Sequence, residues 1–423
     1  MRHDELPPAA RDRTSRPIPI ARGVDGPRRP PGMSMPRAMP AVLLLDGLWN
    51  KTVAAVRSLG KRGYRIAVGE RTRFAPALFS RYCSRRFLHP SPATSPGAFL
   101  DALEKELRVG GYDVVLAMEF DTQVLIARNR PRFEGMARFP FASADLAVRI
   151  QDKGELASFA SAHGVECPAT FRPEGPGDVH AMASLLPYPL LIKPRLSSGG
   201  RGIVRVETPS RLRKEYPKVH AVHPSPILQE CLPPGGAALG VGVLMNYSSE
   251  PRATFAYRRL REYPVGGGPS TLRESVLDET LCRTTERLLS AFGWTGVAMA
   301  EFKVDPRDGR PKLLEVNPRF WGSLHHAVLS GVDFPHLLCR MAIDGDVPPL
   351  REYRVGVRSR SLIHGDLMHF VRNPRRFHLR PRFFDFSIPD DLLSASDPWP
   401  VVGRVATLIP ACYDRELRGM MLG

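Results

Sequence analysis

Residues 300–322 read AEFKVDPRDGRPKLLEVNPRFWG, and this stretch decides the fold. The alternating run Ala298–Val304, a polar turn and the second run Lys312–Val316 predict a β-hairpin. Side chains alternate along a strand with a period of two. If the turn closes locally, Glu301 and Glu315 on the two arms are therefore expected side by side on one face of the sheet.

Two carboxylates placed side by side repel each other, so this hairpin needs a neutralising cation. Asn317 follows Glu315 by two residues and adds a neutral oxygen ligand on the same face. Such an all-oxygen set suits Mg²⁺, which keeps waters and shares phosphate oxygens with a nucleotide. Arg319, two residues further on, adds a planar cation beside the metal. The alternative is a surface hairpin with solvated charges.

The chain has 423 residues, enough for two or three domains, with 43% hydrophobic and 24% charged residues. Its net charge of +17 is unusual, and only nine of its 60 basic residues are lysines. This arginine bias makes the charge weak evidence for nucleic acid or membrane binding. It also makes each lysine more informative.

The cysteines and the hydropathy pattern indicate a soluble protein of a reducing compartment. Six cysteines are scattered without CxxC or Cys/His spacing, which predicts reduced thiols and argues against a zinc site. No apolar run reaches the roughly 18 residues that a transmembrane helix needs. We expect a cytoplasmic protein, with a peripheral position at the membrane left open.

The N-terminal half divides into two predicted parts. Residues 1–40 are rich in Pro and Arg and are expected to be disordered. Residues 41–138 alternate strands with helices, which predicts a parallel-sheet α/β domain. Asp46-Gly47 at the end of its first strand is interpreted as structural, since no G-x-G-x-x-G pattern accompanies it; a ligand site at the sheet edge is the alternative. The expected elements are strands 42–45, 65–69 and 114–117 and helices 52–62 and 99–107.

The second half is expected to be α+β. We assign residues 139–350 to one domain with a lobe at about 155–230, and residues 351–423 to a basic, aromatic-rich C-terminal region. Residues 211–216 are interpreted as part of a polar segment. The other expected elements are helices 152–163 and 278–292 and strands 190–193, 203–206, 227–230, 241–245 and 253–257.

A second group of residues suits phosphate binding. Lys193 ends a strand, and the loop Leu196–Gly202 (LSSGGRG) follows it. Glycines let backbone N–H groups converge on an anion, and a lysine adds a point charge. The spacing is not that of a P-loop, and the strand that follows predicts a hairpin lid. Lys153 is a second rare lysine, and Ile227–Leu232 (ILQECL) can offer a strand edge to an adenine.

In this order these parts resemble the ATP-grasp superfamily, and most closely its carboxylate–amine ligases of the carbamoyl phosphate synthase and D-aspartate ligase type. The resemblance covers about residues 151–345, with residues 41–138 similar to the domain that precedes the ATP-grasp domain. Its most specific motifs are LEVNPR (Leu314–Arg319) and IKPRLSSGGRG (Ile192–Gly202).

The resemblance implies residue roles and cofactors. ATP and Mg²⁺ are expected, with Mn²⁺ left open as a substitute. Glu301, Glu315 and Asn317 would bind the metal, and Arg319 and Lys193 would act on the transferring phosphoryl group. The family usually places an acidic ribose ligand just beyond the adenine strand, but Leu232–Gly240 contains none. The implied nucleotide ligands are Lys153, Lys193, Ser197, Ser198, Gly199, Gly200, Gly202, Glu230, Cys231 and Leu232.

The implied reaction joins a carboxylate to an amine through an acyl phosphate, releasing ADP and phosphate. Arginines near the Gly-rich loop 264–269 are candidates to hold the substrate carboxylate, and a solvated basic loop is the alternative. Small-molecule substrates are expected as partners rather than nucleic acid, with a membrane surface or a cell-envelope precursor left open. The alternative function is a weakly catalytic nucleotide-binding protein that docks on RNA or an anionic membrane through residues 351–423. The substrate candidates are Arg258, Arg261, Gly267 and Ser270.

Overall fold

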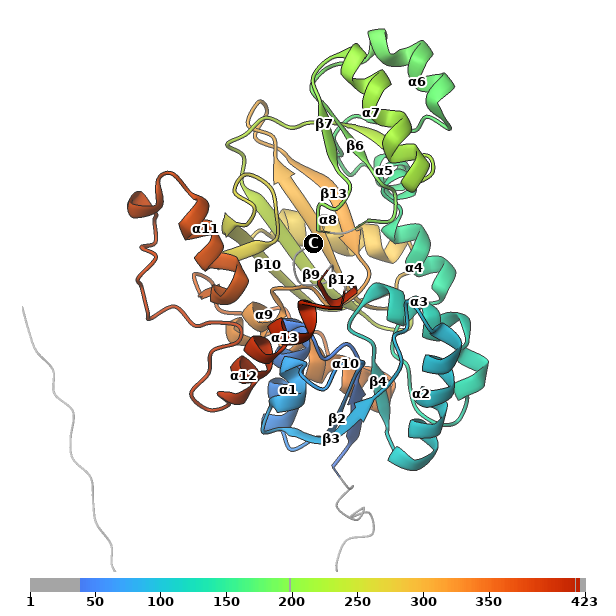
Figure 1. The fold of residues 1–423 in the computed structure, drawn as a ribbon, viewed down its shortest axis with the longest axis vertical. Helices are drawn as coiled ribbons and strands as arrows, with labels where there is room; N and C mark the ends of the chain where they lie inside the picture. The colour runs from blue at the N-terminus through green and yellow to red at the C-terminus, as the bar shows by residue number, and fades with distance from the viewer. Residues whose placement is uncertain (1–38, 198, 415, 419–423) are drawn as a thin grey trace, which may run out of the picture. The chain divides into compact units, whose positions relative to one another are not determined.

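A computed structural model describes residues 39–197, 199–414 and 416–418 of the chain (Figure 1). Residues 1–40 were expected to be disordered, and residues 1–38 of this range lie outside the described residues. The described part contains three sheets, one of them parallel and two antiparallel. This mixed α/β architecture confirms the predicted fold class.

The N-terminal sheet is parallel, with strand order β3-β2-β1-β4. All four residues of β1 are buried, as expected for a strand covered on both faces. The predicted strands and helices are present, but β3 (CSRRFL) was missed because exposed charges interrupt its apolar pattern. The elements are β1 (Ala41–Leu44), α1 (Asn50–Lys61), β2 (Arg65–Glu70), β3 (Cys83–Leu88), α2 (Pro96–Gly110), β4 (Val114–Leu116) and α3 (Phe120–Arg128).

The second sheet forms a small lobe with strand order β5-β8-β6-β7. The polar segment expected at residues 211–216 lies inside helix α7. This helix begins after the cap Thr208 and buries Leu212, Tyr216 and Val219 on one face. The elements are α5 (Lys153–Ala162), β5 (Thr170–Phe171), α6 (Pro176–Met182), β6 (Leu190–Lys193), β7 (Val204–Val206), α7 (Pro209–Val222) and β8 (Ile227–Glu230).

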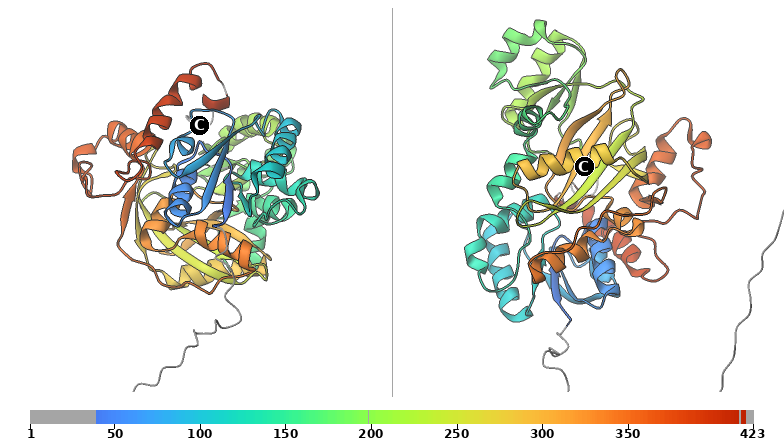
Figure 2. Two further views of the ribbon diagram at one scale, coloured as in Figure 1. Left: turned by 90° about the horizontal axis from the view of Figure 1, so that it is seen from below. Right: turned by 180° about the vertical axis from the view of Figure 1, so that it is seen from behind.

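The central sheet has six strands in the order β13-β12-β9-β10-β11-β14, and it contains the predicted hairpin as β12 and β13. Helix α8 lies across one face of this sheet, as the view from behind in Figure 2 shows. The elements are α4 (Ala144–Gln151), β9 (Ala238–Met245), β10 (Pro251–Glu262), β11 (Ser270–Val276), α8 (Glu279–Ala291), β12 (Gly296–Val304), β13 (Pro311–Asn317), α9 (Leu324–Ser330), α10 (Phe334–Asp344) and β14 (Arg358–Arg360).

The other face of the central sheet shares one hydrophobic core with the N-terminal sheet. Leu44 of β1 and Val53 of α1 belong to the same buried cluster as Phe255 of β10 and Met299 of β12. Helices α9 and α10 contribute to this core and contact α1. The shared core sets the carboxyl ends of the N-terminal strands against the face of the central sheet that carries Glu301.

The region from residue 351 onward is joined to both of these sheets. Strand β14 pairs with β11 in antiparallel register, and helix α12 (Trp399–Ala406) contacts the single turn η1 (Pro76–Phe79). The remaining helices are α11 (Leu367–Arg372) and α13 (Leu408–Ala411). Within the described residues, no helix is both long and apolar enough to cross a membrane.

Candidate active site

The hairpin brings its two glutamates together as the sequence predicted. Glu301 on β12 lies directly opposite Glu315 on β13. The amide nitrogen of Asn317 lies 3.1 Å from Glu315 Oε1 and 3.5 Å from Glu301 Oε1. Both carboxylates and the amide therefore face one place on the sheet.

Each glutamate is paired with a cation in this structure. Arg259 on β10 forms an ion pair with Glu301, and Lys153 Nζ lies 3.3 Å from Glu315 Oε2. Burial raises the pKa of Glu301, and the neighbouring charge of Glu315 adds to the rise. Burial opposes ionisation of Glu315 too, but Lys153 and the Asn317 amide hold its pKa below the usual value. Of the two carboxylates, Glu315 therefore ionises more readily than Glu301.

Lys193 ends β6 and lies in the buried interior of the lobe. Its Nζ donates a hydrogen bond of 2.6 Å to Gln229 Oε1 on the neighbouring strand β8. Only 6% of Lys193 is exposed, and this burial lowers the pKa of its ammonium group to about 8. A cation so poorly solvated is prepared to meet an anion.

The glycine loop joins the antiparallel strands β6 and β7, as the predicted lid hairpin required. Gly199, Gly200 and Gly202 have φ values of 67°, 79° and 73°, where glycine is favoured over other residues. Lys153 donates from Nζ to the backbone oxygen of Ser197, so the loop begins beside the Lys153–Glu315 pair. Ser198, also expected in the site, lies outside the described residues.

In the expected adenine strand and just beyond it, some backbone N–H groups already donate hydrogen bonds to described residues and one does not. The N–H groups of Glu230 and Cys231 already donate, to Ala169 and Pro189 respectively. Leu232 is 6% exposed, and its N–H meets no acceptor in the described parts of the chain. The side chain of Glu230 instead pairs with Arg307 in the turn of the hairpin, 2.5 Å away. Of the three positions, Leu232 offers the clearest free donor.

The N-terminal sheet contributes a lysine and a glutamate that sequence reasoning missed. Lys51 in α1 lies with Nζ 2.5 Å from Glu119 Oε1, and Arg319 Nε lies 3.7 Å from the other oxygen of Glu119. Burial, reinforced by the charge of Arg319, lowers the pKa of Lys51 to about 8. Arg319 follows the hairpin directly, so this contact connects the two sheets. The scarcity of lysine was the one sequence signal that pointed to Lys51.

Glu119 lies where the order of the N-terminal strands reverses, since β1 pairs with β2 on one side and β4 on the other. Ligands of open α/β sheets bind at such a point, beyond the carboxyl ends of the strands. Asp46 at the end of β1 accepts from the N–H groups of Met118 and Glu119 at 2.9 and 2.8 Å. The carboxylate of Asp46 thus holds the backbone at Met118 and Glu119. The side chain of Glu119 instead contacts Lys51 and Arg319.

The glycine loop also brings a positive charge near Glu119. Although burial opposes its ionisation, Lys51 and Arg319 hold the pKa of Glu119 below its usual value, and the charge of Arg201 in the loop contributes. The loop, the N-terminal sheet and the hairpin therefore border one polar site.

The four substrate candidates are not gathered at this site. Arg258 pairs with Glu274 at 2.5 Å, and its side chain is 49% exposed. Arg261 is buried and donates to Asp366 at 2.6 Å, so it serves the packing of the C-terminal region. Gly267 donates to the backbone oxygen of Pro264, and Ser270 donates to that of Leu272 and accepts from Arg273 at 3.3 Å.

The arginine that reaches the carboxylates is Arg259. Tyr257 and Arg259 point to one face of β10 and Arg258 to the other, as a strand period of two requires. A register shift between Arg259 and Arg261 then breaks the alternation. Arg259 also donates to the backbone oxygen of Gly268 at 3.1 Å, which connects the Gly-rich loop to Glu301.

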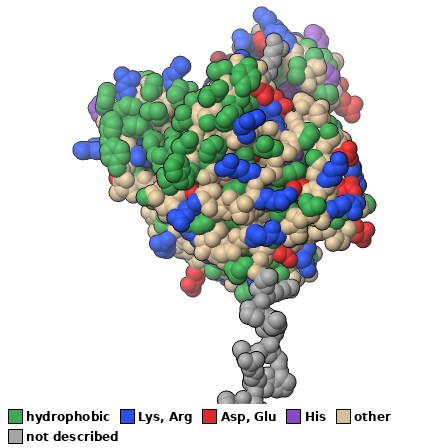
Figure 3. Space-filling model, turned by 60° about the horizontal axis from the view of Figure 1, so that its bottom comes forward, with side chains coloured by type: hydrophobic (Ala, Val, Ile, Leu, Met, Phe, Trp, Pro, Cys, Tyr) green, Lys and Arg blue, Asp and Glu red, His purple; other side chains and the backbone are tan. Residues whose placement is uncertain are grey.

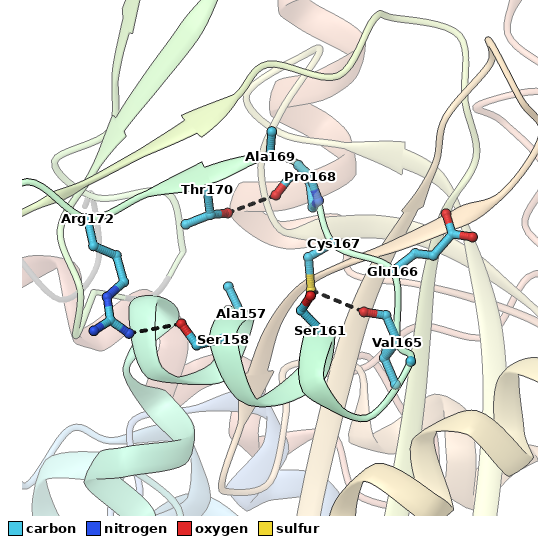
Figure 4. A pocket seen from close by; sticks show the side chains of 11 residues that line it. Ala157, Ser158, Ser161, Val165, Glu166, Cys167, Pro168, Ala169, Thr170 and Arg172 are labelled. Atoms are coloured by element: carbon cyan, nitrogen blue, oxygen red, sulfur yellow. Dashed lines mark hydrogen bonds between the residues drawn. The ribbon is translucent and has the colours of Figure 1, made fainter. Parts of the chain in front are cut away.

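A cavity of about 490 Å³ lies apart from this polar site, between helix α5 and the edge strand β5 (Figure 4). Ser158, Ser161 and Thr170 line it, with Cys167 and Arg172. None of the carboxylates, lysines or arginines described above lines this cavity. It therefore adds nothing to the assignment of the site.

Comparisons with known proteins agree with this arrangement. Residues 248–362 match the family described as ATP-grasp in the biosynthetic pathway with Ter operon. Over 276 residues the chain is 22% identical to the C-terminal section of the carbamoyl phosphate synthase large chain of Methanopyrus kandleri, covering 63% of this chain and 49% of that protein. The chain thus spans about half the length of this curated relative, and less of the next.

Two solved structures share the fold. The biotin carboxylase–βγ-ATP complex of Campylobacter jejuni matches with a TM-score of 0.62 and 16% identity, over 75% of this chain and 74% of that one. L-amino acid ligase of Bacillus licheniformis matches with a TM-score of 0.55 and 18% identity, over 74% and 75%. These solved structures show the same fold, and the ATP-grasp family match over residues 248–362 agrees with the resemblance seen in the sequence.

Proposed function

We propose that this protein is an ATP-dependent ligase that joins a small-molecule carboxylate to an amine through an acyl phosphate. The observation that carries the proposal is the placement of two buried lysines and two facing glutamates around one site. Lys153 and Lys193 lie on the side of the lobe, and Glu301 and Glu315 lie on the central sheet. Cations for phosphates beside carboxylates for a metal are what phosphoryl transfer from ATP requires.

The residues at the hairpin fit a magnesium ion. Glu301 and Glu315 are like charges held opposite each other, and burial together with the charge of Glu315 raises the pKa of Glu301 although Arg259 pairs with it. A further cation would stabilise the ionised pair. Two carboxylates and the Asn317 amide oxygen, after rotation of the amide, make a partial oxygen set that phosphate oxygens and waters complete. Mg²⁺ would neutralise the triphosphate; Mn²⁺ has the same ligand preference.

The protein's own groups then account for both steps. Lys153, Lys193 and the N–H groups of the glycine loop hold the phosphates of ATP in line for transfer. In the first step a substrate carboxylate oxygen attacks the γ-phosphorus, and the bond to the β-phosphate oxygen breaks, releasing ADP. In the second step the amine attacks the acyl carbon, loses a proton and expels phosphate. Arg319 stabilises the charge that develops on the transferring group.

We place the substrate at the Lys51–Glu119–Arg319 contact rather than at Arg258 and Arg261. This contact lies at the strand-order reversal of the N-terminal sheet and borders the hairpin. It contains both signs of charge, so it can meet a carboxylate and an amine. Arg258 and Arg261 already have partners outside the site.

The test is a screen for phosphate release with ATP, Mg²⁺ and paired libraries of carboxylates and amines. Release that requires one member of each library supports the ligase. Glu315→Gln keeps the size of the side chain and removes its charge, so ADP release should fall at least about 100-fold, the scale of losing one electrostatic group in a reaction centre. The matched control is Glu207→Gln, an exposed glutamate whose ion-pair partner within the described residues is Arg205. Full activity of Glu315→Gln would overturn the assignment.

A further inference from the structure

The surface around α11 combines exposed aromatic rings with a run of arginines. Residues 367–384, here called the aromatic–arginine segment, read LMHFVRNPRRFHLRPRFF and contain five arginines but no Asp or Glu. Phe377 and Phe384 are 74% and 62% exposed, and Phe386 just beyond the segment is 81% exposed. Exposed rings gathered in this way mark a contact surface.

The arginines of the segment are free to meet an anionic partner. All five are exposed, and none forms an ion pair with a described residue. The guanidinium of Arg376 lies 5.4 Å from the centre of the Phe377 ring, so cation and ring are presented together. The five are Arg372, Arg375, Arg376, Arg380 and Arg382.

The segment is held in place by the central sheet. The buried Arg261 of β10 donates to Asp366, immediately before the segment, and to the backbone oxygen of Pro381 within it. The rings of Phe370 and Phe383 stack with centres 4.2 Å apart. The exposed rings and arginines therefore project from a fixed platform.

Helices α12 and α13 present a second apolar surface. Their one charged residue, Arg404, points inward and donates to the backbone oxygen of Leu48 and to Asn50. Figure 3 shows hydrophobic side chains gathered over the side of the molecule that carries α11 and α12, with Lys and Arg around them. The large hydrophobic residues exposed on these helices and the turn after them are Trp399, Val402, Val405, Leu408, Ile409 and Tyr413.

We propose that this surface docks the protein on a bilayer of anionic phospholipid. The rings and the aliphatic face of α12 and α13 would enter the headgroup–acyl boundary, and the five arginines would meet lipid phosphates. The two helices together are too short to span a bilayer, which takes about 20 apolar residues. They suit a position in the plane of the interface.

A lipid surface fits better than RNA for two reasons. Bases stack on free ring faces, but Phe370 and Phe383 use their faces on each other. The aliphatic side chains of α12 and α13, such as Val402 and Leu408, gain nothing from RNA and much from an apolar interface. Charge complementarity with anionic headgroups accounts for the absence of acidic residues from the segment.

The test is co-sedimentation of the full chain with vesicles of phosphatidylcholine, with and without phosphatidylglycerol. Binding is expected only with phosphatidylglycerol, and it should weaken as salt is raised. Since one arginine near the surface contributes about 1 kcal/mol, Arg376→Gln with Arg382→Gln should weaken binding about 30-fold. Phe377→Ser with Ile409→Ser should also weaken it, because both side chains are exposed and their loss leaves the core intact.

The matched controls are Arg128→Gln and Val222→Ser, two exposed residues of other helices that should leave binding unchanged. Equal binding to both vesicle types, or no effect of either pair of substitutions, would overturn the proposal. Binding of labelled RNA that the same substitutions abolish, without vesicle binding, would assign the surface to RNA. Loss of a dimer in the variants, again without vesicle binding, would assign it to a second copy of the chain.

Discussion

Lys193 shows most directly how burial prepares a single residue for function. Its ammonium group has one recorded partner among the described side chains, the neutral amide oxygen of Gln229. Burial lowers its pKa to about 8, although the nearby charge of Glu315 opposes this shift. A bound phosphate would add negative charge beside Lys193 and stabilise the protonated form. Nucleotide binding and the protonation of Lys193 are therefore linked.

The affinity for ATP should consequently fall as the pH rises through about 8. Below this pH the free protein already has the proton that phosphate binding needs, and above it each pH unit costs up to about tenfold. Calorimetry at pH 7 and pH 9 should show roughly tenfold weaker binding at pH 9. Lys193→Met should bind weakly at both pH values, whereas Lys51→Met should keep the slope. An unchanged affinity of the unmodified protein would contradict the link.

At the scale of elements, strand β9 depends on two glycines for its position in the central sheet. A Cβ on Gly242 would lie 2.3 Å from the ring of Trp321, and one on Gly240 would lie 2.5 Å from that of Tyr257. Both rings are fully buried and belong to the core shared with the N-terminal sheet. The absence of side chains at these two glycines thus leaves room for the rings of Trp321 and Tyr257, which pack in the core between the two sheets.

Gly242→Ala should destabilise the protein by about 1–3 kcal/mol, because the new methyl group overpacks the site of Trp321. Chemical denaturation followed by tryptophan fluorescence measures this loss. Gly97→Ala is the matched control, since a Cβ there has nothing within 4 Å and the residue lies in helix α2. That change should be neutral or slightly stabilising. Equal stability of the two variants would contradict the packing argument.

At the scale of the whole molecule, buried ion pairs tie the C-terminal region to both sheets. Asp366 pairs with Arg261 of β10, and Asp391 pairs with Arg273 of β11. Asp397 pairs with Arg57 of α1 at 2.9 Å, with both side chains at most 6% exposed. Removing residues after 354 would therefore disrupt the fold, so only point substitutions can test the membrane surface.

Asp397→Ala should cost about 3–5 kcal/mol, because it leaves the buried guanidinium of Arg57 without its carboxylate. Asp385→Ala is the control, since among the described residues its carboxylate accepts hydrogen bonds from Ser387 alone and it is not buried. A shift in the midpoint of urea unfolding for the first variant alone is expected. Similar midpoints for both would mean that the C-terminal region is not coupled to α1.

The local parts of the site could be predicted from the sequence. Alternating apolar residues on both sides of a polar turn predict the hairpin with Glu301, Glu315 and Asn317. A lysine at the end of a strand, followed by glycines and a second strand, predicts the lid. These patterns span few residues, so the backbone periods alone decide which side chains meet. The same reasoning placed β1, β2, β4, α1 and α2 of the N-terminal domain but not β3 and α3.

Contacts that depend on packing could be decided only by the tertiary structure. Arg259, rather than Arg258 or Arg261, reaches Glu301 because alternation and a register shift in β10 set the faces of these side chains. Lys51 and Glu119 reach Arg319 because a shared apolar core places one sheet against another. The alternation of residues over a few positions in the sequence thus determined which side chains lie together on the hairpin and in the lid. The burial of apolar faces between distant elements decided which other groups stand around them.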